Sequence, residues 1–143
     1  MMRISDVLRR KGDMVATITP DATVRTLLAQ LAEYGIGAMV VSDSDGALQG
    51  IVSERDVVRA LQSEGDGILD GPVSSIMTAD VHTCGPSDTV VDMARAMTER
   101  RIRHVPVLAD NQLVGIVSIG DIVKQRIDEL TAERDHLSAY IST

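Results

Sequence analysis

An internal repeat constrains the fold of this chain more than any other feature of its sequence. Adding 66 to the residue numbers of the first half carries Pro20 onto Pro86, with Thr-Val three residues further on in both copies. A one-residue deletion then shifts the offset to 65, and the run Gly-Ile-Val-Ser at 50–53 recurs at 115–118. A sequence that repeats in this way encodes one supersecondary unit twice. We therefore expect two similar halves.

The hydrophobic pattern within each copy predicts the order β-α-β-β-α. In the first copy, alternating residues 17–20 stop at a proline and predict a strand, and apolar residues at helical spacing follow over 24–34. Two short apolar runs, 38–41 and 48–52, flank a polar turn that is typical of a hairpin. A second helix begins at Ser53. The predicted fold class is therefore α/β (α+β), with two such repeats.

The repeat also sets the predicted domain organisation. Short apolar segments at 4–8 and 73–77 occupy matching places before the two copies and predict a lead-in helix for each. Glycine, aspartate and proline gather between the copies and indicate a linker. The predicted parts are the first repeat at 1–64, the linker at 65–72, the second repeat at 73–130 and a C-terminal helical tail at 131–143.

The last helix carries an approximate heptad of apolar residues, which Arg134 interrupts. The members of this seam are Val123, Ile127, Leu130, Leu137 and Ile141. A tail with this pattern usually packs on a partner or on its own copy. We therefore expect a homodimer.

Composition argues against several classes of function. The formal charge of −7 opposes binding to a nucleic-acid backbone, and no apolar run approaches the roughly 20 residues of a membrane span. The N-terminus lacks the apolar core of a secretory signal, and the single cysteine, Cys84, matches a reducing compartment. We predict a cytoplasmic protein that binds neither nucleic acid nor membrane.

A Ser-x-x-Asp segment follows the last predicted strand in both copies, as Ser53 with Asp56 and as Ser118 with Asp121. A serine before a helix and an acid three residues later form a capping box, which many helices carry without binding any ligand. The same geometry exposes backbone N–H groups to a phosphate and fixes a carboxylate that can accept hydrogen bonds from a ribose diol. The residues by themselves leave both interpretations open.

These motifs, together with the run Arg-His-Val-Pro-Val at 103–107, resemble tandem CBS domains, named after cystathionine β-synthase. The resemblance covers the chain from about residue 4 to about residue 126. It implies two repeats packed about a pseudo-twofold axis, dimerisation, and clefts between the repeats that bind AMP, ADP, ATP, NAD or S-adenosylmethionine. It therefore implies a regulatory module, an energy or redox-state sensor that modulates an unidentified partner protein.

The resemblance also implies roles for individual residues. Arg103 and His104 would contact phosphate. In the first copy their places are taken by Gly37 and Ala38, which supply no cation, so the two clefts should differ in affinity. Arg55 could provide the missing charge. The other implied binding residues are Asp56 and Asp121 for ribose, Ser53 and Ser118 for ribose or phosphate, Thr17 and Thr83 for the adenine edge, and Pro106 beside the phosphate contacts.

Other interpretations of these residues stay open. The basic stretch 100–104 also suits the C-terminal end of a helix, where cations stabilise the dipole, and a nucleic-acid patch is a third interpretation. Arg55 and Arg59, one helical turn apart, are equally typical of solvated arginines. Threonine is simply common in strands, which weakens the assignment of Thr17 and Thr83.

Three functions are consistent with these observations: a nucleotide sensor, a ligand-free structural or dimerisation module, and a small enzyme acting on nucleotides. An enzyme would need a general base or a metal cluster. His82 and Cys84 are too few ligands for zinc, and Cys84 is interpreted as a core residue. We predict a non-enzyme without catalytic residues, catalytic cofactor or metal. Its expected ligand is AMP or NAD, then ATP or ADP, since the arginines argue against S-adenosylmethionine.

Overall fold

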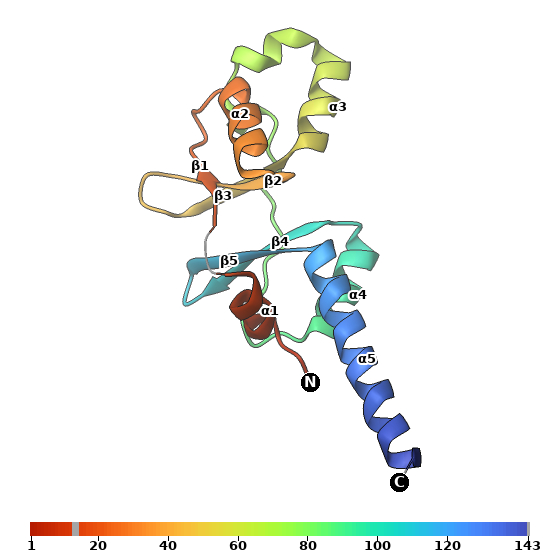
Figure 1. Ribbon diagram of the computed structural model, residues 1–143. Helices are drawn as coiled ribbons and strands as arrows, with labels where there is room; N and C mark the ends of the chain where they lie inside the picture. The colour runs from red at the N-terminus through yellow and green to blue at the C-terminus, as the bar shows by residue number, and fades with distance from the viewer. Residues whose placement is uncertain (13–14, 143) are drawn as a thin grey trace. The chain divides into compact units, whose positions relative to one another are not determined.

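The predicted β-α-β-β-α order is confirmed in the computed structural model, which describes residues 1–12 and 15–142 (Figure 1). The elements of the first repeat are β1 (Thr17–Ile18), α2 (Val24–Tyr34), β2 (Ala38–Ser42), β3 (Leu48–Ser53) and α3 (Glu54–Glu64). The second repeat has a single β-bridge at Cys84 in place of its first strand. It continues with α4 (Val90–Arg100), β4 (His104–Ala109), β5 (Gln112–Ser118) and α5 (Ile119–Ser142).

Each repeat builds its own small sheet. In the first, β2 lies between β1, to which it is parallel, and β3, to which it is antiparallel. In the second, β4 pairs with β5, and Cys84 pairs in parallel with Val107. The turn between β4 and β5 places Asp110 and Asn111 at φ of 52° and 62°. Two consecutive positive φ angles make a tight hairpin, which accounts for the one-residue deletion between the copies.

The compact units do not follow the order of the repeats along the chain. One unit comprises Met1–Met14, Thr83–Asp110 and Val114–Thr143, and the other comprises Val15–His82 and Asn111–Leu113. Helix α1 (Ile4–Lys11) thus belongs with the second repeat, although it precedes the first (Figure 1). Conversely, the short 3-10 helix η2 (Val73–Ser75) belongs with the first repeat. The repeats have exchanged their lead-in segments, and we call the two bodies the α1–α5 unit and the β1–α3 unit.

The exchanged segments complete the two hydrophobic cores. Ile4 and Val7 of α1 are buried in the core of the α1–α5 unit, and Val73 of η2 is fully buried in the core of the β1–α3 unit. Cys84 is also a core residue, as its sequence position suggests. Burial, reinforced by the charge of Asp88, raises the pKa of the Cys84 thiol to about 12. Such a thiol stays protonated and acts as a small apolar side chain.

Local structure between the repeats is more regular than a linker composition indicates. Helix α3 ends at Glu64, and the 3-10 helix η1 (Asp66–Asp70) follows at once. Ile68 and Leu69 of η1 pack partly buried against the core of the β1–α3 unit. The predicted lead-in helix is confirmed before the first repeat as α1, whereas before the second it is only the three-residue η2 after Pro72.

Two glycines of the repeated Gly-Ile-Val-Ser run lie directly under the exchanged segments. A Cβ atom added at Gly50 would lie 2.6 Å from the carbonyl oxygen of Thr78 and 2.9 Å from the Met77 sulfur. A Cβ atom added at Gly115 would lie 2.5 Å from Leu8 Cδ2. In both repeats the lead-in segment therefore crosses the last strand where that strand has no side chain.

Only the first half of helix α5 packs against the unit to which it belongs. Its first half buries Ile122 and Gln125, but every residue from 131 to 141 is exposed. The predicted apolar seam is exposed along its whole length, at Val123, Ile127, Leu130, Leu137 and Ile141. Within the described residues, neither α5 nor any other helix has the length and apolarity that crossing a membrane requires.

The crossing at Gly50 makes a testable prediction about stability. Gly50→Ala should lower the free energy of unfolding by about 1–3 kcal/mol, because the added methyl group meets a backbone carbonyl that cannot rotate away. Gly67→Ala is the matched control, since a Cβ atom there meets nothing within 4 Å. Urea denaturation would measure both, and equal stabilities of the two variants would contradict the close approach.

Candidate functional site

In the β1–α3 unit, the predicted residues gather where β2 begins and β3 ends. Ser53 caps α3: its hydroxyl oxygen accepts a hydrogen bond from the backbone N–H of Asp56 at 3.3 Å. Asp56 Oδ2 accepts in return from the backbone N–H of Ser53 at 2.8 Å. The N–H of Glu54 donates to the carbonyl of Gly37 at 3.0 Å, and Ala38 pairs with Ser53. The capping interpretation is confirmed for this repeat.

We call the residues around Ser53 and Asp56 the first group. The second group, around Ser118 and Asp121 in the α1–α5 unit, has the same geometry. The Ser118 hydroxyl oxygen accepts from the backbone N–H of Asp121 at 3.1 Å, and Asp121 Oδ2 accepts from the backbone N–H of Ser118 at 2.9 Å. The N–H of Ile119 donates to the carbonyl of Arg103 at 2.8 Å, as Glu54 does to Gly37 in the first repeat. The backbone of Arg103, which directly precedes β4, is thus brought to the N-terminus of α5.

A residue that the sequence did not indicate joins the second group. Lys11, the last residue of α1, places its Nζ 2.7 Å from Asp121 Oδ2. The same ammonium group donates to the carbonyl oxygen of Ile116 at 2.9 Å. The exposed fractions are 35% for the Lys11 side chain and 25% for that of Asp121, so water screens this ion pair only in part.

The ion pair changes the acidity of Asp121. Burial acts to raise the pKa of the Asp121 carboxyl. The hydrogen bonds from Lys11 and from the Ser118 backbone, with the Lys11 charge and the Ser118 hydroxyl, outweigh burial and hold the pKa below its ordinary value of 3.8. Asp121 is therefore a carboxylate at neutral pH and has a cation on one of its oxygens.

The remaining predicted residues lie on the same strands or just outside them. Thr17 is exposed in β1 and pairs with Val40 of β2. Thr83 directly precedes Cys84, whose N–H donates to the carbonyl of Pro106 at 3.1 Å. Pro106 itself is buried, and Arg55 is exposed in the first turn of α3.

The basic stretch after α4 has more than one structural role. Arg100 lies in the last turn of α4, so the helix-end interpretation is confirmed for this residue. Arg101 is the C-cap at φ 55°, in the left-handed region, where the first repeat has Gly35 at φ 64°. Arg103 is exposed and His104 is half-buried. The backbone carbonyl of Arg103 is bonded to Ile119, the residue after Ser118.

The two groups therefore differ in charge. A Cβ atom on Gly37 would lie 3.2 Å from the Glu54 carboxylate, so an acid borders the first group in addition to Asp56. In the second group Lys11 is paired with Asp121, and the backbone carbonyl of Arg103 accepts from the N–H of Ile119.

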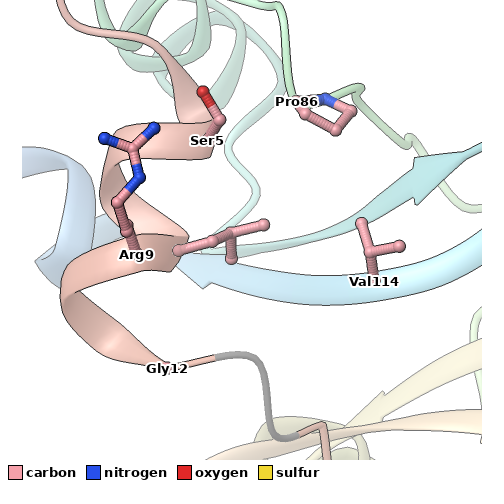
Figure 2. A pocket seen from close by; sticks show the side chains of 6 residues that line it. Ser5, Arg9, Gly12, Pro86 and Val114 are labelled. Carbon is pink, nitrogen blue, oxygen red and sulfur yellow. The ribbon is translucent and has the colours of Figure 1, made fainter.

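A pocket of about 460 Å³ lies elsewhere in the α1–α5 unit (Figure 2). Figure 2 shows Ser5 and Arg9 of α1 on one side of it and Pro86 and Val114 on the other. Arg9 is exposed and already paired with Asp6 at 3.3 Å. None of the predicted site residues lines this pocket, whose full lining is Ser5, Leu8, Arg9, Gly12, Pro86 and Val114.

Comparison with known proteins gives consistent matches along the chain. The family model of the CBS domain matches residues 4–63 and again residues 73–128. The CBS domain-containing protein CBSX3, mitochondrial, of Arabidopsis thaliana is 36% identical over 146 residues, which cover 96% of this chain and 71% of the relative.

Solved structures of CBS-domain proteins also match most of this chain. The CBS-domain containing protein ATU1752 from Agrobacterium tumefaciens has a TM-score of 0.85 at 42% identity, covering 87% of this chain and 99% of that one. The CBS domain pair of protein MJ0100, solved in complex with 5-methylthioadenosine and S-adenosyl-L-methionine, has a TM-score of 0.80 at 25% identity. That match covers 90% of this chain and 98% of the MJ0100 chain.

The lowered pKa of Asp121 predicts how stability depends on pH. Because the pKa is lower in the folded than in the unfolded state, the carboxylate stabilises the fold above about pH 4–5 and loses this contribution as the pH falls through the folded-state pKa. The stability difference between wild type and Asp121→Asn should therefore shrink on acidification. Denaturation series between neutral and acidic pH would measure it, with Asp45→Asn in an exposed turn as control. A difference that grows on acidification would contradict the ion pair.

Proposed function

Because this chain belongs to the CBS-domain family, we propose that it is a cytoplasmic regulatory module that binds an adenosine nucleotide and modulates a partner protein without catalysing a reaction. The ligand contacts in this proposal are the two Ser-x-x-Asp groups and the strand residues beside them. The MJ0100 domain pair, whose complex holds two adenosine-containing ligands, supports an adenosine ligand for this chain as well.

The observation that carries this proposal is the fixed pair of carboxylates at the starts of α3 and α5. Asp56 and Asp121 are each held by a backbone N–H at 2.8 and 2.9 Å, so their positions are set before any ligand arrives. A carboxylate held in this way accepts hydrogen bonds from a ribose diol with little loss of side-chain entropy. The N-terminus of the helix beside it favours negative charge.

The charges around Asp121 support a ligand with a phosphate. Arg103, whose carbonyl is bonded to the N-terminus of α5, directly precedes β4, and His104 is the first residue of β4. Both side chains suit a phosphate better than the sulfonium of S-adenosylmethionine. We therefore propose AMP or NAD as the preferred ligand, followed by ATP or ADP. The second repeat should bind more tightly than the first, where Gly37 and Ala38 supply no cation.

Calorimetric titration with AMP, NAD, ATP and S-adenosylmethionine would test the proposal. Asp121→Ala should weaken binding of the preferred nucleotide by about 1.5–3 kcal/mol, the range of charge-assisted hydrogen bonds. Asp56→Ala should remove a second, weaker binding event.

Asp6→Ala is the matched control for these variants. Asp6 completes the capping box of α1 with a 2.9 Å bond from the Arg3 backbone N–H, but it is not among the predicted site residues. This variant should lose stability and keep its affinity. If Asp121→Ala behaves in the same way, the carboxylate only caps α5, and if wild type binds no adenylate, the proposed function is wrong.

A second candidate function, a ligand-free dimerisation module, is favoured by the exposed seam of α5. Ten to twelve residues of helix are marginal in water unless they pack on something, yet the described residues after 130 bury nothing within the chain. The spacing of the seam suits pairing with the same helix of a second copy. Dimerisation is also compatible with the sensor, because a nucleotide could act on a dimer.

The seam predicts the oligomeric state. Sedimentation of the wild type at micromolar concentration should give a dimer, and Leu137→Glu should shift it to monomer, because a carboxylate would be buried in the seam. Ala139→Glu, about half a helical turn away on the exposed tail, should remain dimeric. A monomeric wild type, or equal dissociation of both variants, would contradict pairing through this seam.

A further inference from the structure

We propose that Lys11 competes with the bound nucleotide for Asp121, so that a ribose must displace its ammonium group and thereby releases the end of α1. This inference rests on the proposed function, since it concerns the same carboxylate. It adds an internal competitor supplied by the chain itself.

The contacts of Lys11 show why the two would compete. Lys11 Nζ and the Ser118 backbone N–H both donate to the same oxygen of Asp121, Oδ2, at 2.7 and 2.9 Å. A ribose diol that takes both carboxylate oxygens needs room on Oδ2, and the ammonium group is the donor that can move. The Ser118 N–H is fixed in the backbone at the start of α5.

The ammonium group is also held by a second acceptor, which keeps it at the carboxylate. It donates to the Ile116 carbonyl at 2.9 Å. The corresponding carbonyl in the first repeat, Ile51, accepts instead from the backbone N–H of Thr78 at 2.9 Å. The carbonyl of the last strand thus accepts from a side chain in the second repeat and from the backbone in the first. A side-chain donor can move away when a ligand binds, whereas a backbone donor is fixed.

The competitor is confined to one of the two groups. Aligning the lead-in segments so that Leu8 matches Met77 places Asp80 opposite Lys11. Within the described residues, the Asp56 carboxylate makes no ion pair; its recorded hydrogen bonds come from Ser53 alone. Ligand binding at Asp56 would therefore meet no such competition.

Release of Lys11 affects the C-terminal end of α1. Arg10 remains anchored to Asp128 at 2.6 Å and to Gln125 at 3.0 Å, so most of α1 stays on α5. Lys11 is followed by Gly12 at φ 98°, and the other unit begins at Val15. Displacement of Lys11 by a nucleotide would thus free the last residue of α1 while Arg10 keeps the preceding turn in place.

The test compares adenosine with AMP in Lys11→Met, which keeps an unbranched apolar side chain, one heavy atom shorter, and removes the charge. Both are titrated by calorimetry in the Asp56→Ala background, so that only the second group is observed. Adenosine has a ribose and no phosphate, so any change in its affinity reports on Asp121 rather than on phosphate contacts. We expect Lys11→Met to bind adenosine about three- to tenfold more tightly. Arg10→Met is the matched control and should not tighten binding.

A ligand-free readout checks the ion pair itself. Carboxyl NMR titration should show a higher Asp121 pKa in Lys11→Met than in the parent protein, because the cation that lowers it is gone. An unchanged Asp121 pKa would overturn the inference.

The outcomes separate this inference from the proposed function. If AMP binds the parent protein but Lys11→Met leaves adenosine affinity equal or weaker, Lys11 is no competitor and only the inference fails. A loss confined to AMP would identify Lys11 as a phosphate contact, which also overturns it. If no variant, nor the wild type, binds AMP, NAD or ATP, the proposed function and the inference fail together.

Discussion

The burial of each lead-in segment in the other repeat's core is the constraint on which the rest of this structure depends. Ile4 and Val73 are both fully buried, each in a core whose strands and helices come from the other copy. Neither repeat can close its core with the segment that precedes it in the sequence. The glycine at 50 or 115 follows from this arrangement, because the incoming segment leaves no room for a side chain on the last strand.

The same exchange makes the two carboxylate groups chemically unequal. It brings the C-terminal end of α1, with Lys11, to Asp121, and it brings the backbone of Thr78 rather than a cation to the first repeat. Glu54 beside Gly37 adds negative charge to the first group. Two nearly identical capping boxes therefore have different charged neighbours, which is the physical basis of the proposed difference in affinity between them.

A regulatory protein needs both a ligand site and a surface that contacts its partner. In this chain, helix α5 carries residues proposed for each of them. Its N-terminus holds Asp121, and its C-terminal half carries the exposed apolar seam around Leu137. In the proposed function, the nucleotide contact at Asp121 and the pairing surface around Leu137 would therefore lie on the same helix.

The sequence by itself determined the elements, the repeat and both capping boxes, because these depend on periodicity and on hydrogen bonds between residues three apart, such as Ser118 and Asp121. It also indicated Cys84 as a core residue. Only the tertiary structure decided which lead-in closes which core and which cation reaches Asp121. Lys11 is separated from Asp121 by 110 residues, and no local pattern encodes that contact. It arises because the cores exchange their lead-in segments, and such an exchange is decided by packing between distant parts of the chain.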